Sequence, residues 1–269
     1  MDFFQTFVLA LIEGLTEYLP ISSTGHMIFA SSYFEIQNDD FVKLFQVSIQ
    51  FGAILAVVVL YWKKFFTLSK YDFYIKLACA VLPALVLGKL LDDKIEAVLG
   101  NPIPIAIVLI LGGVVLLFVD SQFQNPTVVS EEEISIKKAV TIGFWQCLAM
   151  MPGTSRSAAS IIGGMQQGLT RQTAAEFSFF LAVPTMMAVT LYSVFLKTYE
   201  TTHLKGYELI LKSNENIKLF FIGNAIAFVV AILAIKLFIG IIKKYGFKPW
   251  GWYRIIVGVF LVLYFTFYK

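Results

Sequence analysis

Six stretches of this chain are apolar over about 20 residues each, the length that an α-helix needs to cross the hydrocarbon core of a bilayer. They lie at residues 41–62, 74–91, 102–120, 173–196, 217–242 and 252–268. The chain of 269 residues is 58% hydrophobic and only 14% charged, whereas soluble domains carry about 25% charged residues. The sequence therefore predicts an all-α polytopic membrane protein with six full transmembrane helices.

Two further apolar regions, 2–34 and 138–168, are each interrupted by a proline, Pro20 in the first and Pro152 in the second. Proline removes a helical hydrogen-bond donor and clashes with the preceding turn, so each region predicts two half-helices around an unwound corner. Irregular backbone at membrane depth is tolerated only where protein or a water-filled cavity surrounds it. We therefore expect two re-entrant helix–loop–helix hairpins.

The chain contains an internal repeat. An offset of 132 residues aligns the two prolines with each other and Ser23 with Ser155. Repeat one covers residues 1–120 and repeat two covers 138–269, and each holds one hairpin followed by three spans. Three crossings are an odd number, so the second half is expected to be inverted within one integral domain.

Charged residues between the spans predict the orientation. Lysines follow the first and the fifth span, at Lys63, Lys64, Lys70, Lys243, Lys244 and Lys248. Loops rich in lysine and arginine remain in the cytoplasm, which places a turn at Asp92–Glu96, the loop 197–216 and both termini outside. The net charge of +3 comes without a basic run, which argues against a nucleic-acid partner.

Glu13 and Glu17 introduce two carboxylates into the first apolar region. Their i, i+4 spacing puts both on one face of a helix. Two carboxylates this close in a low dielectric need a cation or a shared proton. The pair thus indicates a divalent-metal site or a general base with an orienting partner, and the alternative is a position at the membrane interface.

Ser22, Ser23, Thr24 and His26 follow directly after the first corner. The amides that begin the next half-helix attract an anion, and the hydroxyls add further hydrogen bonds. Ser23 could attack phosphorus after giving its proton to His26 or Glu17, or His26 could itself be the nucleophile. Ordinary helix capping is the alternative for the hydroxyls.

The second corner carries Gly153, Thr154, Ser155, Arg156 and Ser157. A guanidinium is always charged, and its planar fork of donors matches a phosphate group. The repeat is expected to bring this corner towards the first one, which favours phosphate binding over contact with a lipid headgroup.

Three polar positions elsewhere are open to two interpretations. Glu176, at the head of the fourth span, is either catalytic or paired with Arg171. Gln46 and Gln50 share one face of the first full span, where they line the same site or join helices by hydrogen bonds.

Together these motifs resemble those of the undecaprenyl-diphosphate phosphatases of the bacitracin-resistance (BacA) type. The resemblance rests on Glu13-x-x-x-Glu17, Pro20-x-Ser22-Ser23-Thr24-Gly25-His26 and Pro152-Gly153-x-Ser155-Arg156-Ser157, together with residues 174–179 and 181–184. It implies an integral enzyme that removes the terminal phosphate of undecaprenyl diphosphate, regenerates the lipid carrier for peptidoglycan synthesis and confers bacitracin resistance.

The resemblance also implies roles for residues and a cofactor. The expected catalytic residues are Glu17, Ser23, His26 and Arg156. The expected substrate-binding residues are Ser22, Thr24, Gly153, Thr154, Ser155 and Ser157. Glu13 and Glu17 are expected to bind a divalent cation, Mg²⁺ or Ca²⁺.

The expected location is the cytoplasmic (inner) membrane of a bacterium, with the site opening towards the outer face and the polyprenyl chain of the substrate lying between apolar helices. A homodimer through faces of small residues is left open. The rival function is a polyprenyl-phosphate flippase or transporter, because inverted repeats with broken helices also build transporters.

Overall fold

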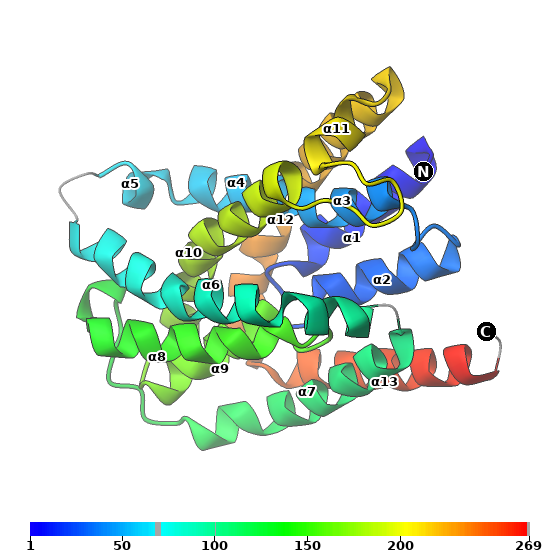
Figure 1. Cartoon of the computed structure of the whole chain (residues 1–269). Coiled ribbons are helices and arrows are strands. Elements are labelled where there is room, and N and C mark those ends of the chain that lie inside the picture. The colour runs from blue at the N-terminus through cyan, green and yellow to red at the C-terminus, as the bar shows by residue number, and fades with distance from the viewer. Residues whose placement is uncertain (68–70, 100, 268–269) are drawn as a thin grey trace.

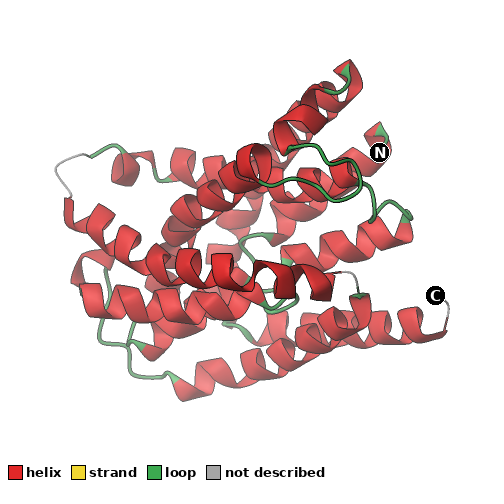
Figure 2. Cartoon of the chain, viewed as in Figure 1, coloured by secondary structure: helices red, strands yellow, loops and turns green. Residues whose placement is uncertain are grey.

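The computed structural model describes residues 1–67, 71–99 and 101–267, and that part of the chain is built of helices without strands (Figure 2). The α-helices are α1 (Phe3–Thr16), α2 (Ser23–Tyr33), α3 (Asp40–Ser48), α4 (Gln50–Leu60), α5 (Trp62–Phe65), α6 (Tyr71–Leu99), α7 (Pro102–Gln122), α8 (Ile136–Gln146), α9 (Arg156–Gln166), α10 (Arg171–Leu191), α11 (Gly206–Leu211), α12 (Asn214–Tyr245) and α13 (Lys248–Phe267). Short 3₁₀ turns lie at Glu131–Glu133 (η1) and Cys147–Met150 (η2), and a π-helical turn lies at Tyr192–Leu196 (η3).

Six helical segments of the described chain are long and apolar enough to cross a membrane, which confirms the predicted number of full spans. They are Asp40–Leu60, Tyr71–Gly88, Pro102–Gln122, Arg171–Leu196, Asn214–Tyr245 and Lys248–Phe267.

One local prediction is wrong. The expected turn at Asp92–Glu96 does not form, because α6 continues as a helix to Leu99. Between Lys89 and Leu99 the sequence has neither glycine nor proline, so nothing in the backbone stops the helix there.

Each predicted hairpin is a pair of short helices that pack against each other, α1 with α2 and α8 with α9. The two pairs open towards opposite ends of the molecule (Figure 1). The chain leaving α2 reaches Asp40, whose carboxylate accepts hydrogen bonds from Thr202, close to α11. The chain entering α8 passes Glu131, which forms an ion pair with Lys64 of α5 at the other end. Opposite entry is the arrangement that an inverted repeat requires, and insertion of the hairpins into a bilayer stays a prediction.

The helix caps correct the register of the repeat in this region. Ser22 and Ser155 are both N-caps with positive φ, 70° and 76°, and each side chain accepts a backbone N–H three residues on. The two caps are 133 residues apart, whereas Pro20 and Pro152 are 132 residues apart. An alignment of the repeats by their caps therefore shifts the two prolines by one position relative to each other. Ser23 and Arg156 consequently occupy equivalent places, as the first residues of α2 and α9.

Helices of each repeat pack against helices of the other repeat. Helix α1 lies against α12 of the other repeat, α8 lies against α6, and α7 pairs with α13. Glycines permit the close approach, since a Cβ at Gly14 would lie 2.7 Å from the Ala227 carbonyl oxygen and one at Gly143 would lie 2.1 Å from that of Ala80. Gly113 is likewise covered by α13 of the same chain. These glycines therefore pack against other helices of the same chain.

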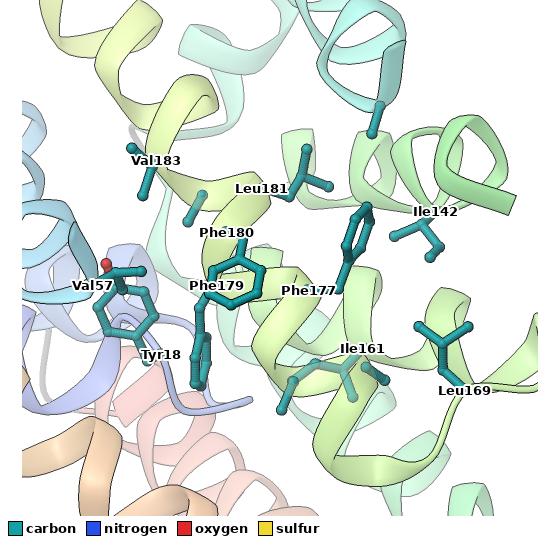
Figure 3. Close-up of a cluster of buried hydrophobic side chains, with 14 of the residues drawn as sticks. Tyr18, Val57, Ile142, Ile161, Leu169, Phe177, Phe179, Phe180, Leu181 and Val183 are labelled. Atoms are coloured by element: carbon teal, nitrogen blue, oxygen red, sulfur yellow. The ribbon is translucent and has the colours of Figure 1, made fainter. Parts of the chain in front are cut away.

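The main hydrophobic core surrounds the first half of α10 and the end of the α1 segment (Figure 3). The Tyr18 ring meets Phe179 edge-on at 5.0 Å, and its hydroxyl donates to the Ala53 carbonyl oxygen at 2.8 Å. Phe180 packs edge-on against Tyr61. These contacts hold the residue next to Glu17 in a close-packed environment.

Candidate active site

An ion pair between Glu17 and Arg156 joins the two corners. Oε1 of Glu17 lies 2.8 Å from Nη2 of Arg156, although 139 residues separate them in the chain. Both side chains are buried, with relative exposures of 5% and 9%. The sequence prediction that the two corners meet is therefore confirmed.

Ser23 contacts the other oxygen of the same carboxylate. Its hydroxyl donates a hydrogen bond of 2.5 Å to Oε2 of Glu17. A single carboxylate thus joins the first residue of α2 to Arg156, the first residue of α9. Hydrogen bonds to an ionised partner are short and strong, which fits this distance.

Arg156 is held in place from the opposite side by α10. Its Nη1 donates to the carbonyl oxygen of Ser178 at 2.9 Å and to the Ser178 hydroxyl at 3.2 Å. The Ser160 hydroxyl lies 2.7 Å from the Ser178 hydroxyl and donates to the Arg156 carbonyl oxygen. The guanidinium also lies 5.6 Å from the centre of the Tyr18 ring, within the range of a cation–π contact.

The two corners have strained backbones where they meet the helices. Besides the two serine caps, Gly153 has φ +95°, a conformation that glycine adopts without cost. Positive φ at a serine persists only where the surroundings hold it. Here the Ser157 hydroxyl donates to the Leu19 carbonyl oxygen at 2.7 Å and lies 3.0 Å from that of Ser155, which connects one corner directly to the other.

Thr24 and Thr154, both expected to bind substrate, are half-buried beside these corners. Each residue directly adjoins a group of the cluster, Thr24 next to Ser23 and Thr154 next to Ser155.

The ring nitrogens of His26 contact groups other than the Ser23 hydroxyl. Its Nδ1 lies 2.8 Å from the Ser22 carbonyl oxygen, and its Nε2 lies 2.9 Å from the Tyr253 hydroxyl. The two rings are stacked, with centroids 5.7 Å apart. A carbonyl oxygen only accepts, so Nδ1 carries the proton and, in the neutral ring, Nε2 accepts from Tyr253.

Glu13 is fully buried, and neither of its carboxylate oxygens has a hydrogen-bond partner among the described residues. A buried carboxylate without a partner is costly unless it gains a proton or a cation. No cluster of three or more His, Cys, Asp or Glu side chains exists in the described part that could bind a metal. Mg²⁺ nevertheless commonly uses one or two carboxylates together with water and substrate phosphate, so Glu13 and Glu17 fit such an ion.

Several functional contacts were not expected from the sequence. Ser178 orients Arg156, and Tyr253 contacts His26. Arg254 is completely buried next to both corners. An arginine within an apolar span is the one signal that could have drawn attention to this position.

The structure distinguishes between the two interpretations of Glu176. The expected pairing of Glu176 with Arg171 is wrong, because Arg171 pairs with Asp120 at 2.6 Å and Glu176 accepts from Gln172. Arg171 is closer to Asp120 because α10 begins beside the end of α7.

Of the two glutamines on the first full span, Gln46 donates a long hydrogen bond of 3.4 Å to the Met27 carbonyl oxygen and so joins helices. Gln50 is buried, with its side-chain oxygen unpaired within the described chain.

Fold and site together define an all-α polytopic membrane protein with a buried Ser–Glu–Arg cluster where two helical hairpins meet. A family model described as "Bacitracin resistance protein BacA" matches residues 6–260, so the chain belongs to the BacA family.

Relatives with assigned names agree with this membership. An undecaprenyl-diphosphatase of Flavobacterium johnsoniae is 53% identical over 264 residues, covering 98% of this chain and 96% of the relative. One from Porphyromonas gingivalis is 46% identical over 280 residues, covering 98% and 96%. One from Bdellovibrio bacteriovorus is 46% identical over 269 residues, covering 99% and 97%.

Proposed function

We propose that this protein is an undecaprenyl-diphosphatase, a membrane hydrolase that converts undecaprenyl diphosphate to undecaprenyl phosphate and inorganic phosphate. Similarity to relatives of that name over nearly the whole chain supports the proposal. The product is the lipid carrier of peptidoglycan synthesis, so abundant enzyme would confer bacitracin resistance. The corresponding location is the cytoplasmic membrane of a bacterium.

The observation that carries the chemistry is the double contact of Glu17. Its carboxylate accepts a hydrogen bond from the Ser23 hydroxyl and also forms an ion pair with Arg156. A nucleophile in hydrogen-bond contact with a base, and a base oriented by a third group, is the geometry expected of an activated serine. The structure offers no equivalent contact for His26, whose two ring nitrogens bind elsewhere. Of the two alternatives left open by the sequence, serine as nucleophile is the better supported.

The proposed reaction begins with transfer of the Ser23 hydroxyl proton to Glu17 as the serine oxygen attacks the terminal phosphorus. The bond from that phosphorus to the bridging oxygen breaks, and undecaprenyl phosphate leaves with the bridging oxygen. Water then attacks the phosphoserine, Glu17 returns its proton to the departing serine oxygen, and inorganic phosphate leaves with both protons of the water, which restores the serine hydroxyl and the Glu17 carboxylate. Positioning and charge stabilisation supply most of the acceleration in phosphoryl transfer.

Arg156 is the proposed anchor of the diphosphate, because its guanidinium matches the geometry of phosphate oxygens. The first-turn amides of α2 and α9 that precede those bonded to the Ser22 and Ser155 side chains would add donors from both corners. Thr24, Thr154 and the corner serines would border the bound group. When the substrate binds, Arg156 would exchange its contact with Glu17 for one with phosphate, which leaves Glu17 able to take the serine proton.

A divalent cation held by Glu13 and Glu17 would supply charge neutralisation for the diphosphate. Glu13 is the residue that favours this proposal, because its buried carboxylate has no partner in the described chain.

The polyprenyl chain would lie among apolar helices within the bilayer, and the site would open towards the outer face. Two observations support an orientation of the chain with both termini outside. Both termini lie at the end of the molecule that carries the loop before α11, and the lysine-bearing α5 lies at the opposite end (Figure 1). By the positive-inside rule, the α5 end is the cytoplasmic one.

Phosphate release from undecaprenyl diphosphate by detergent-purified protein tests the proposal. We expect release that EDTA abolishes, and that Arg156→Ala and Glu17→Ala abolish as well. Arg171→Ala is the matched control, since it removes an arginine ion pair remote from the cluster. A folded wild-type protein that releases no phosphate with Mg²⁺ or Ca²⁺ present, yet moves the lipid between leaflets, would instead establish the transporter.

A further inference from the structure

Arg254 of α13 forms an unusual set of contacts for a buried charged side chain. It is completely buried and has no carboxylate partner in the described part of the chain. Its guanidinium donates only to backbone carbonyl oxygens, those of Leu109 at 3.0 Å, Val108 at 3.5 Å, Pro20 at 3.0 Å, Gly153 at 2.8 Å and Thr154 at 3.0 Å. The contacts therefore reach α7 and both corners of the active site.

We infer that Arg254 is a positioning residue that fastens the two corners to each other and to α7. Through them it fixes the relative placement of Ser23 and Arg156, each of which begins the helix that follows its corner. The inference rests on the proposed function in one respect, namely that these two residues act on one substrate.

The shape of the arginine side chain explains why this residue type is needed. A guanidinium presents five N–H donors in a rigid plane, so it can serve three chain segments at once. The compact ammonium group of lysine has only three donors around one nitrogen, so it cannot reach all of these carbonyl oxygens at once. A buried charge without an ionic partner is costly, and it persists here because every direction of the fork meets a carbonyl dipole.

Helix α7 leaves room for this group. A Cβ at Gly112 would lie 2.2 Å from Nη2 of Arg254, so any larger residue would displace the guanidinium. On the corner itself, a Cβ at Gly153 would lie 2.5 Å from the Ile105 carbonyl oxygen, which shows how closely the corner packs on α7. Gly112 thus leaves the space that the Arg254 guanidinium occupies, and Gly153 lets the corner that Arg254 contacts pack closely on α7.

The hydrogen bonds also orient the corner peptides. The carbonyl and N–H of a trans peptide point in opposite directions. The Thr154 carbonyl faces Arg254, so the N–H of Ser155 points away from it, at the entrance to α9. Loss of the guanidinium would leave three corner carbonyl oxygens unpaired and free this peptide to rotate.

The test compares Arg254→Met and Arg254→Lys with wild-type enzyme. A displacement of about 1 Å in a catalytic group costs roughly 100-fold in rate, so we expect Arg254→Met to lower kcat by about that factor and KM much less. Arg254→Lys should recover part of the loss. In Arg254→Ala, guanidinium chloride should restore activity, and sodium chloride at the same concentration should not.

Amide hydrogen exchange supplies a second measurement that does not depend on turnover. In Arg254→Met we expect faster exchange confined to residues 19–26 and 151–158, with helices α6 and α12 protected as in wild type. Arg171→Met, which breaks the pair with Asp120, is the matched control and should leave both corners unchanged. If Arg254→Met fails to fold, Gly112→Ala should give the same local effect, and Gly240→Ala, with open space around its Cβ, should not.

The inference is overturned if wild-type protein is active and Arg254→Met stays within about threefold of it in kcat, since a factor of ten is already only about 1.4 kcal/mol. Exchange that rises uniformly across the helices would also overturn it, because Arg254 would then stabilise the fold in general. Wild-type protein without phosphatase activity would refute the proposed function instead, and the exchange pattern would still decide the role of Arg254.

Discussion

The Ser23 hydroxyl donates to Oε2 of Glu17 at 2.5 Å. Of the two residues that the sequence offered as the base for this serine, Glu17 and His26, it is therefore Glu17 that contacts the hydroxyl. The imidazole lies three residues further along α2 and contacts the Tyr253 hydroxyl. The contact leads to distinct expectations for Ser23, Glu17 and His26.

Ser23→Ala should abolish turnover, with a loss on the order of 1,000-fold or more in kcat, because removal of a nucleophile eliminates the covalent route. Acid quenching of wild-type enzyme during turnover of substrate labelled in the terminal phosphate should trap the label on a peptide containing Ser23. His26→Gln should retain the labelled serine. A label found on His26 in wild-type enzyme would refute serine attack.

Glu17→Gln should lower kcat by about 100- to 10,000-fold, because an amide accepts a hydrogen bond but cannot take the serine proton. It should also destabilise the protein by roughly 3–5 kcal/mol, since it leaves the buried Arg156 charge without its partner. Thermal unfolding in detergent measures the second effect.

The double variant Glu17→Gln/Arg156→Met separates the two effects of Glu17. Removal of both charges should recover much of the stability while activity stays absent. Recovery of activity together with stability would show that Glu17 acts only through the fold.

Tyr253→Phe should lower kcat by about 3- to 10-fold, because a net hydrogen bond contributes about 0.5–1.5 kcal/mol and Nε2 of His26 loses its donor. Tyr245→Phe is the matched control, since Tyr245 is exposed near the end of α12. Equal activity of Tyr253→Phe and wild type would mean that His26 is positioned by its contact with Ser22 alone.

The local sequence is enough to predict the spans and the polar corners. The length of an apolar stretch predicts a membrane-spanning helix, and Pro20 and Pro152, each followed by polar residues, mark the two corners. Glu17 and Arg156 could be assigned to one site because each is an ionisable group with a recognisable chemistry in apolar surroundings.

The remaining contacts could not be predicted for a different physical reason. Arg254 binds backbone carbonyl oxygens, which every residue possesses and which leave no mark on the sequence. Ser178 orients Arg156 through a carbonyl and a hydroxyl on a helix whose rotation is set by core packing. The register of the repeat depended on Ser22 and Ser155 as caps, and backbone angles decide which residue is the cap.

Glu13 provides the test of the cation. Its carboxylate is buried and has no hydrogen-bond partner in the described chain, so any charge that it carries in the absence of a cation destabilises the fold. Glu13→Gln removes that charge, and we expect the variant to unfold at a higher temperature than wild type when EDTA is present. Added Mg²⁺ or Ca²⁺ should stabilise wild-type protein by mass action and should have little effect on the variant.

The Glu13→Gln variant should also need more cation for activity. The Mg²⁺ concentration for half-maximal phosphate release should rise by about 10- to 100-fold, the range seen when residues that support a metal site are changed. Glu176→Gln is the matched control, because that carboxylate contacts Gln172 and lies outside the cluster. If Glu13→Gln kept the cation dependence of wild type in both unfolding and turnover, the buried carboxylate would carry a proton, and the cation would have to bind through other groups.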